Sequence, residues 1–505
     1  MNLNLTRQVK FSHIEPIVIF LLAPILLFLI FWNLGGYPTT SGWDEGLYLQ
    51  FSQNLSHYGI YGTNNGGHFD ILTPTGGTGP ILTSSIALAF NLFGTSLFSA
   101  RFVSTIFLII SIIGLYLLIR EISNWQVACF SIFIYLVAGY ESYDTLWMGR
   151  QVLGEVPSTA FLFLGLWGLI RVVKQKSLPT LIISLILLGL AVVSKNQLVW
   201  VLVPAMAVMT FWDLVLIKKD HWKVFLGAMI VVVISFLAWY VASLILVGND
   251  RAVFQENQSY NFTVLYLRIG LSRVLENIKL IRNSGFFIPI ILSCLYAIIG
   301  IFKNKGMIDQ ARALLFALAG FGLFSSIIIS LPWARYIYTG IVLTIPVLSA
   351  LVNDCIIWLK SHNHTLLWYG LSICLIVFMG FIALKLFTDT NLIIQTKNDD
   401  VQKFAELVDR TVPTGSEVFN WEWDVEFYSR SEFVHPDFKL FSALVDQTYN
   451  KVDSPILHNT YIPVGAHYLI VGPFASQSGM FAEEGNQRAI NPLGQVGDYS
   501  LYYMK

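Results

Sequence analysis

The chain has 505 residues and a formal net charge of zero, and 55% of its residues are hydrophobic while only 12% are charged. Soluble domains carry roughly 25% charged residues, so the composition excludes a soluble protein and predicts a polytopic helical membrane protein. The balanced charge provides no bulk basic field, and we expect no nucleic-acid partner.

Long apolar runs recur along the chain, as membrane-spanning helices require. The first, residues 17–34, lacks a small-residue cleavage site, so we expect a retained span and not a removed signal peptide. We predict about eleven spans in total. The others lie at residues 98–119, 127–140, 157–173, 178–193, 198–217, 224–247, 286–302, 314–331, 336–358 and 366–387.

Basic residues indicate the orientation. Arg7 and Lys10 precede the first span, which places the N-terminus in the cytoplasm. Residues 35–96 then form an outer loop, and the short loops on the N-terminal side of the membrane are basic, as the positive-inside rule requires. A second outer loop, residues 248–285, also carries several Arg and Lys residues. Either lipid headgroups or a phosphate ligand could balance this charge.

The composition changes near residue 391. Residues 401–407 have the spacing of a short amphipathic helix, and residues 417–419 and 468–472 have that of β-strands. We therefore predict a transmembrane domain at residues 1–390 and a small soluble α/β domain at residues 391–505, on the outer face.

Charged side chains gather at the outer ends of the predicted spans. Each has a simple structural explanation, because acidic residues cap helices and basic residues favour helix ends or reach to the membrane interface. Together they supply the carboxylates and cations needed to handle a lipid phosphate and a hydroxyl. They are Asp44 and Glu45 after the first span, Arg150 and Glu155 after the third, Lys195 after the fifth, and Arg335 and Tyr336 after the ninth.

The chain also carries a series of motifs: Trp43-Asp-Glu-Gly-x-Tyr, then Pro80, then Leu92-Phe-Gly-Thr-Ser-Leu-Phe-Ser-Ala-Arg101. This series resembles the first outer loop and second span of the C-type (GT-C) glycosyltransferases. More narrowly, it resembles the branch of the protein O-mannosyltransferases and the lipid A aminoarabinose transferase. Further segments match that branch in order and spacing, namely residues 149–157, 189–195 and 332–336, and Trp421-Glu-Trp-Asp is similar to loosely related bacterial members.

The resemblance implies a GT-C fold, a polyprenyl-phosphate-linked sugar donor and an acceptor on the outer face. It also implies that the acidic residue of the first outer loop, here Asp44, is the catalytic base. A positioned carboxylate can accept the proton that an acceptor hydroxyl loses as it attacks the anomeric carbon. One carboxylate with a good leaving group predicts inversion, without the paired nucleophile of retaining hydrolases.

The departing group in such a transfer is a lipid phosphate, whose developing negative charge needs cations. We predict that Arg335, Lys195 and Arg150 bind this phosphate, in that order of preference, with Tyr336 beside them. Membrane lipids are further expected partners, and the acceptor is a glycolipid, a polysaccharide or a protein.

Three more residues are candidates for binding or orienting the acceptor: Glu45, Glu155 and His68. His68 is also explained simply as a polar residue of a loop. A divalent cation, Mg²⁺ or Mn²⁺, held by Asp44 and Glu155 is an open alternative, because hard cations bind carboxylates. The sequence lacks the dense acidic cluster that would favour it.

Two other functional classes stay open. The chain could be a transporter or flippase of lipids or lipid-linked sugars, or a noncatalytic subunit that binds a lipid-linked sugar. Transporters place charges near the bilayer midplane, often in repeated halves. Here the charges lie at span ends on one face and no internal repeat is visible, which favours the transferase.

Overall fold

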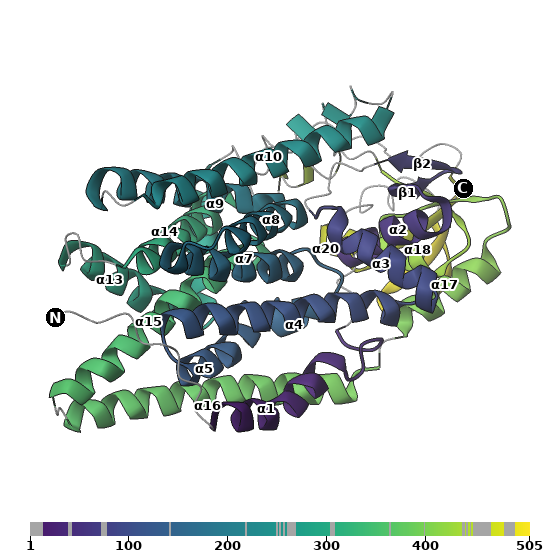
Figure 1. Cartoon of the computed structure of the whole chain (residues 1–505). Coiled ribbons are helices and arrows are strands. Elements are labelled where there is room, and N and C mark those ends of the chain that lie inside the picture. Colours follow the sequence, from purple (N-terminus) through teal and green to yellow (C-terminus); the bar gives the residue numbers. More distant parts are fainter. Residues whose placement is uncertain are drawn as a thin grey trace.

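The computed structural model describes residues 14–38, 43–71, 78–140, 143–217, 220–248, 251, 254–255, 258–259, 269–303, 309–362, 365–397, 399–436, 440, 443–444, 446–447, 466–478 and 490–504. Most of these residues form a bundle of long apolar helices that run in roughly the same direction (Figure 1). The helices of the bundle are α1 (Ile14–Phe31), α4 (Leu97–Ile122), α5 (Trp125–Leu136), α7 (Glu155–Gln175), α8 (Leu178–Ser194), α9 (Val199–Trp212), α10 (Trp222–Val247), α13 (Phe287–Lys303), α14 (Gln310–Phe324), α15 (Tyr338–His362) and α16 (Thr365–Gln395).

The bundle confirms an integral membrane protein. Within the described ranges, eight helices are long and apolar enough to cross a membrane, or nine if the bent pair α12 (Leu271–Asn283) and α13 forms one span. The prediction was about eleven. The difference lies in α5 and α8, which are apolar but only 12 and 17 residues long, whereas a full span needs about 20 residues. Because α5 packs between α4 and α15, protein and not lipid surrounds much of this short helix.

Smaller elements cover one end of the bundle. They are α2 (Trp43–Tyr58), the antiparallel hairpin of β1 (Gly62–Asn65) and β2 (His68–Ile71), α3 (Pro80–Phe93), α6 (Thr145–Gly149) and α12. The helix α2 begins with Asp44 and Glu45 in its first turn, where negative charge stabilises the helix dipole. The axis of α12 is bent by 105° from that of α13.

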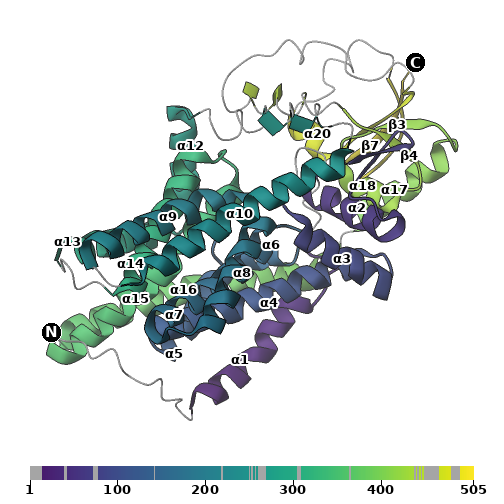
Figure 2. The same ribbon diagram turned by 45° about the horizontal axis from the view of Figure 1, so that its top comes forward.

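The C-terminal domain lies at the same end (Figure 2). Its five-stranded sheet has the order β4-β3-β5-β7-β6, in which β3 pairs in parallel with β4 and β5, and β7 pairs antiparallel with β5 and β6. The preceding helix α16 continues to Gln395, past the composition change near residue 391. The elements of this domain are α17 (Asp400–Thr411), β3 (Glu417–Phe419), α18 (Trp423–Tyr428), β4 (Glu432–Val434), β5 (Tyr468–Val471), α20 (Pro473–Ser478), β6 (Ile490–Val496) and β7 (Tyr499–Met504).

Close backbone packing joins this domain to the bundle end. A Cβ atom at Gly46, in α2, would lie 2.2 Å from the backbone nitrogen of Asp424 in α18. Only glycine therefore allows α2 and α18 to approach this closely. As a result, the helix that carries Asp44 also packs directly against the C-terminal domain.

Candidate active site

An ion pair joins two residues that lie far apart in the sequence. The Oδ2 atom of Asp44, in the first turn of α2, lies 2.5 Å from Nη1 of Arg335. Arg335 belongs to the short 3₁₀-helix η6 (Ala334–Ile337), which precedes α15. The side chain of Arg335 is 9% exposed and that of Asp44 is 21% exposed. The convergence predicted from the span ends is therefore present for these two residues.

A second ion pair lies beside the first. The Nζ atom of Lys195, directly after α8, is 2.8 Å from Oε1 of Glu155, in the first turn of α7, and both side chains are buried. Tyr336 links the two pairs, because its ring centroid is 5.0 Å from the guanidinium carbon of Arg335 and 5.8 Å from Nζ of Lys195. Two cations thus share one aromatic ring, an arrangement that the ring quadrupole favours.

Tyr48 completes this cluster and was not among the predicted site residues. It lies one turn after Asp44 in α2 and is 2% exposed. Burial, followed by the negative charge of Asp44, raises the pKa of Tyr48 well above its usual 10, while Arg335 opposes the shift. The phenol therefore stays protonated as a hydrogen-bond donor. Its position in the Asp-Glu-Gly-x-Tyr motif is the signal that could have identified it.

The segment that leads into α3 is fixed against Lys195. Thr78 and Lys195 form an antiparallel β-bridge, and the Gly79 N–H donates to the Ser194 carbonyl at 3.2 Å. A Cβ atom at Gly79 would lie only 1.7 Å from the carbonyl oxygen of Val193. The glycine is required for this close approach, which brings the segment before α3 to the site.

Glu45 has surroundings unlike those of its neighbour Asp44. Its two carboxylate oxygens accept hydrogen bonds from Nε and Nη2 of Arg101 at 2.8 and 2.7 Å, and Oε1 also accepts from the Val152 N–H at 3.1 Å. The pair is fully buried. Glu45 therefore joins α2 to α4, and its predicted role in orienting an acceptor stays a prediction. The contact also brings together the two halves of the motif that ends at Arg101.

Arg150 makes its hydrogen bonds at the end of α1. Its guanidinium is buried and donates to backbone carbonyls at and after the C-terminal end of α1, where carbonyls lack helical partners. These contacts give Arg150 a structural role, its predicted phosphate-binding role stays a prediction, and Glu155 pairs with Lys195. The accepting carbonyls belong to Leu29, Ile30, Trp32, Asn33 and Tyr37.

His68 is exposed, and the predicted metal ligands are paired with basic side chains. His68 lies on β2 with a 66% exposed side chain, 3.4 Å from Oδ1 of Asp70, and outside the cluster of ion pairs. Among the residues with described positions, no group of three or more His, Cys, Asp and Glu side chains could hold a metal ion. Asp44 and Glu155 are each paired with a basic side chain. These surroundings do not fit a divalent cation.

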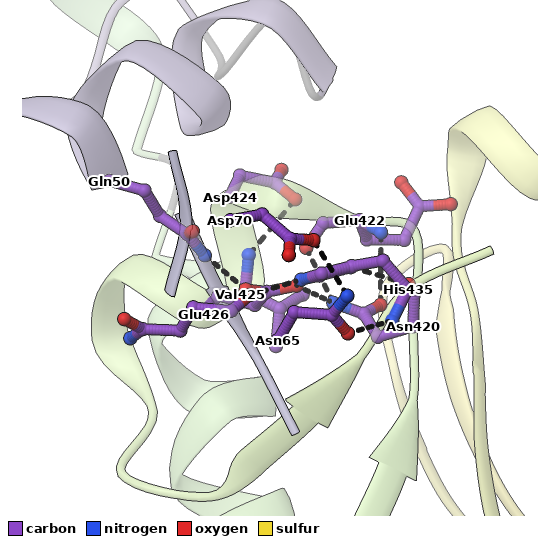
Figure 3. A network of polar contacts seen from close by, with 10 residues as sticks. Gln50, Asn65, Asp70, Asn420, Glu422, Asp424, Val425, Glu426 and His435 are labelled. Carbon is purple, nitrogen blue, oxygen red and sulfur yellow. Dashed lines mark hydrogen bonds and ion pairs between the residues drawn. The ribbon is translucent and has the colours of Figure 1, made fainter. Parts of the chain in front are cut away.

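A polar network fixes the C-terminal domain on α2 (Figure 3). Glu426 accepts hydrogen bonds from Gln50 in α2 and, at 2.8 Å, from Asn420, and it lies 3.2 Å from Nε2 of His435. Burial alone would lower the pKa of His435, but the Glu426 carboxylate and hydrogen bonds to Asn420 and Asn64 raise it above the usual 6.5. The network connects the Trp421-Glu-Trp-Asp region to α2, whose first turn contains Asp44.

Comparison with known proteins supports the fold assignment. Residues 78–240 match the family model of dolichyl-phosphate-mannose-protein mannosyltransferases. No curated protein matches the sequence.

Solved structures match over nearly the whole chain. ArnT from Cupriavidus metallidurans bound to undecaprenyl phosphate has a TM-score of 0.62 and 12% identity, covering 97% of this chain and 98% of that chain. The Archaeoglobus fulgidus oligosaccharyltransferase in the apo form has a TM-score of 0.58 and 13% identity, covering 99% and 75%. AglB from the same organism, in complex with an inhibitory peptide and a dolichol-phosphate, has a TM-score of 0.56 and 13% identity, covering 98% and 74%. These matches confirm the predicted GT-C fold.

Proposed function

We propose that this protein, which has the GT-C fold, is a membrane glycosyltransferase that moves a sugar from a polyprenyl-phosphate donor to an acceptor hydroxyl. The family model matched by residues 78–240 supports a lipid-phosphate-linked sugar donor. So do the similar structures that contain undecaprenyl phosphate and dolichol-phosphate. The observation that carries the proposal is the contact between Asp44 and Arg335 beside the pair of Glu155 and Lys195.

Asp44 is the proposed catalytic base. Of the three acidic candidates predicted from the sequence, Glu45 is 0% exposed and Glu155 is 3% exposed, whereas Asp44 is 21% exposed. An acceptor hydroxyl can therefore reach Asp44 with the least rearrangement. A carboxylate in hydrogen-bond range of that hydroxyl accepts its proton during attack.

Arg335 and Lys195 are the proposed ligands of the donor phosphate, and Tyr336 packs against both. In this scheme the phosphate takes Arg335 from Asp44, which leaves the carboxylate to accept a proton. The acceptor oxygen then bonds to the anomeric carbon as the bond from that carbon to the phosphate oxygen breaks. The lipid phosphate leaves with the electron pair, and Asp44 holds the proton. A single displacement of this kind inverts the anomeric configuration.

The distribution of charge supports an extracytoplasmic site. Arg101 and Glu155 stand at the site end of α4 and α7, whereas Arg120 and Lys174 stand in the last turns of the same helices. The positive-inside rule assigns the Arg120 and Lys174 end to the cytoplasm. The site and the C-terminal domain then lie on the outer face, and the N-terminus lies inside.

Transfer by purified protein tests the proposal. Asp44→Asn should lower turnover of a polyprenyl-phosphate sugar by about 10²–10⁴-fold, the usual contribution of a general base. Asp399→Asn is the matched control, because Asp399 is 56% exposed in the C-terminal domain and should leave turnover unchanged. Wild-type turnover retained by Asp44→Asn would rule out this base. Movement of lipid-linked sugar across vesicles without any transfer would favour a transporter instead.

A further inference from the structure

The chain segment that leads to Arg335 is irregular. After α14 the chain forms the π-helix η5 (Ser325–Ile329), and Ser330 is extended with ψ of 152°. In a π-helix, the carbonyl of residue 327 would accept from the N–H of residue 332. Residue 332 is proline, which has no N–H. The carbonyls of Ile327 and Ser330 therefore need a donor from elsewhere in the protein.

Asn277, in α12, supplies both hydrogen bonds. Its Nδ2 atom donates to the Ile327 carbonyl at 3.1 Å and to the Ser330 carbonyl at 2.9 Å. The side chain is fully buried, and one amide nitrogen carries the two protons that these acceptors need. Asn277 thus holds the two ends of the turn that precedes Arg335.

The helix α12 holds Asn277 in place because it packs against the segment that contains the two carbonyls. Asn277 lies at the centre of its buried face, with Arg273 one turn before it and Ile281 one turn after it. The same helix contacts both η5 and η6. Its bend of 105° from α13 carries it across the segment that it braces.

We infer that Asn277 is a positioning residue that sets the place of Arg335 relative to Asp44 and the donor phosphate. This inference rests on the proposed function and deepens it. Ser330 is five residues before Arg335, so a change in the anchored turn moves the guanidinium. A misplacement of about 1 Å at a reacting site can cost about 10²-fold in rate.

The test compares kcat/KM for the donor in four variants and the wild type. Asn277→Asp keeps the shape but replaces the donating amide with a carboxylate facing two carbonyls, and it should lower kcat/KM by about tenfold or more. Asn283→Asp is the matched control, since Asn283 lies on the same helix with its side chain exposed, and it should stay within about twofold. The last two variants are Arg335→Lys and the combination of Asn277→Asp with Arg335→Lys.

Non-additivity separates positioning from general stability. If Asn277 acts through Arg335, the double variant should be little worse than Arg335→Lys alone. Multiplying effects in the double variant, or wild-type kcat/KM in Asn277→Asp, would overturn the inference. Asn277→Ala, which removes the donors without adding charge, carries the same comparison if Asn277→Asp does not fold. A wild-type protein without transfer would count against the proposed function, and active wild type with unaffected Asn277 variants against the inference alone.

Discussion

Asp44 and Glu45 are adjacent in the chain but have opposite surroundings. Glu45 is held in a fully buried pair with Arg101, while Asp44 is partly exposed beside Arg335. Breaking a buried ion pair costs about 3–5 kcal/mol, because it leaves an uncompensated charge. Glu45→Gln should therefore destabilise the protein by about that amount, and Asp44→Asn should not. Thermal unfolding in detergent measures the difference, and a Glu45→Gln protein of wild-type stability that lacks transfer would contradict it.

Arg335 should matter more for the donor than for the fold. Its partner Asp44 keeps contact with solvent, so removal of the guanidinium leaves a carboxylate that water can still hydrate. Arg335→Ala should lower kcat/KM for the donor by about 10²–10³-fold, the cost of losing one preorganised group that stabilises developing charge. Arg312→Ala is the control, because Arg312 pairs with Asp354 in another ion pair of similar length, 2.7 Å. Equal donor kinetics in Arg335→Ala and the wild type would refute the role.

At this scale the sequence predicts where charges lie better than what they contact. Asp44 and Arg335 could be predicted to meet, because each follows a span that ends on the same face. Arg150 follows a span in the same way, but its partners are backbone carbonyls after α1. Carbonyls are present in every residue, so no side-chain pattern distinguishes this arrangement from a phosphate site. For the same reason, the sequence could not predict that Asn277 donates to two backbone carbonyls.

At the scale of elements, the stability of the contact between the C-terminal domain and α2 should depend on pH. His435 has a raised pKa in the folded protein because of Glu426. A raised folded-state pKa means that the stabilisation is complete below pH 6.5 and is lost as the pH rises through the folded value. Glu422, whose pKa burial and then Asp424 raise to about 8, gives the same sign. The domain should therefore become easier to cleave by protease as the pH rises from 6.5 past 8.

Substitutions can assign this pH dependence. His435→Gln should reduce the slope of protease susceptibility against pH, and addition of Glu422→Gln should reduce it further, because each change removes one titrating group. Lys403→Gln, on the exposed face of α17 with a 58% exposed side chain, should leave the slope unchanged. An unaltered slope in the double variant would show that other titrating groups cause the pH dependence of this contact.

The elements themselves were partly predictable. The amphipathic helix and two of the strands in the C-terminal domain follow from periodicity, and the structure has α17, β3 and β5 at those places. The length of α5 could not be predicted, because the apolar run 127–140 continues past Leu136, where the helix ends. Gly139, with φ of +149°, and the bend near it stop the helix. Hydropathy measures apolar content, and here the apolar residues beyond Leu136 pack in a turn.

For the molecule as a whole, the two ends of the bundle differ in chemistry. One end holds the site and the C-terminal domain, and the other holds basic residues at the last turns of α4 and α7. The order of strands in the C-terminal sheet could not be predicted, since the sheet is mixed: two parallel pairings are followed by two antiparallel ones. The segregation of charge between the two ends of the bundle could be predicted from the sequence. It leads to a prediction about the orientation of the protein in the membrane.

Labelling with a membrane-impermeant thiol reagent tests that orientation. In a variant whose four cysteines are replaced by serine, Lys403→Cys places a thiol on the C-terminal domain and Asp220→Cys places one at the opposite end, between α9 and α10, where the Asp220 side chain is 84% exposed. Intact cells should label Lys403→Cys, and permeabilised cells both, because the positive-inside rule puts the basic end in the cytoplasm. The reverse pattern would place the site inside the cell, where the proposed donor phosphate would have to be reached from the cytoplasmic leaflet.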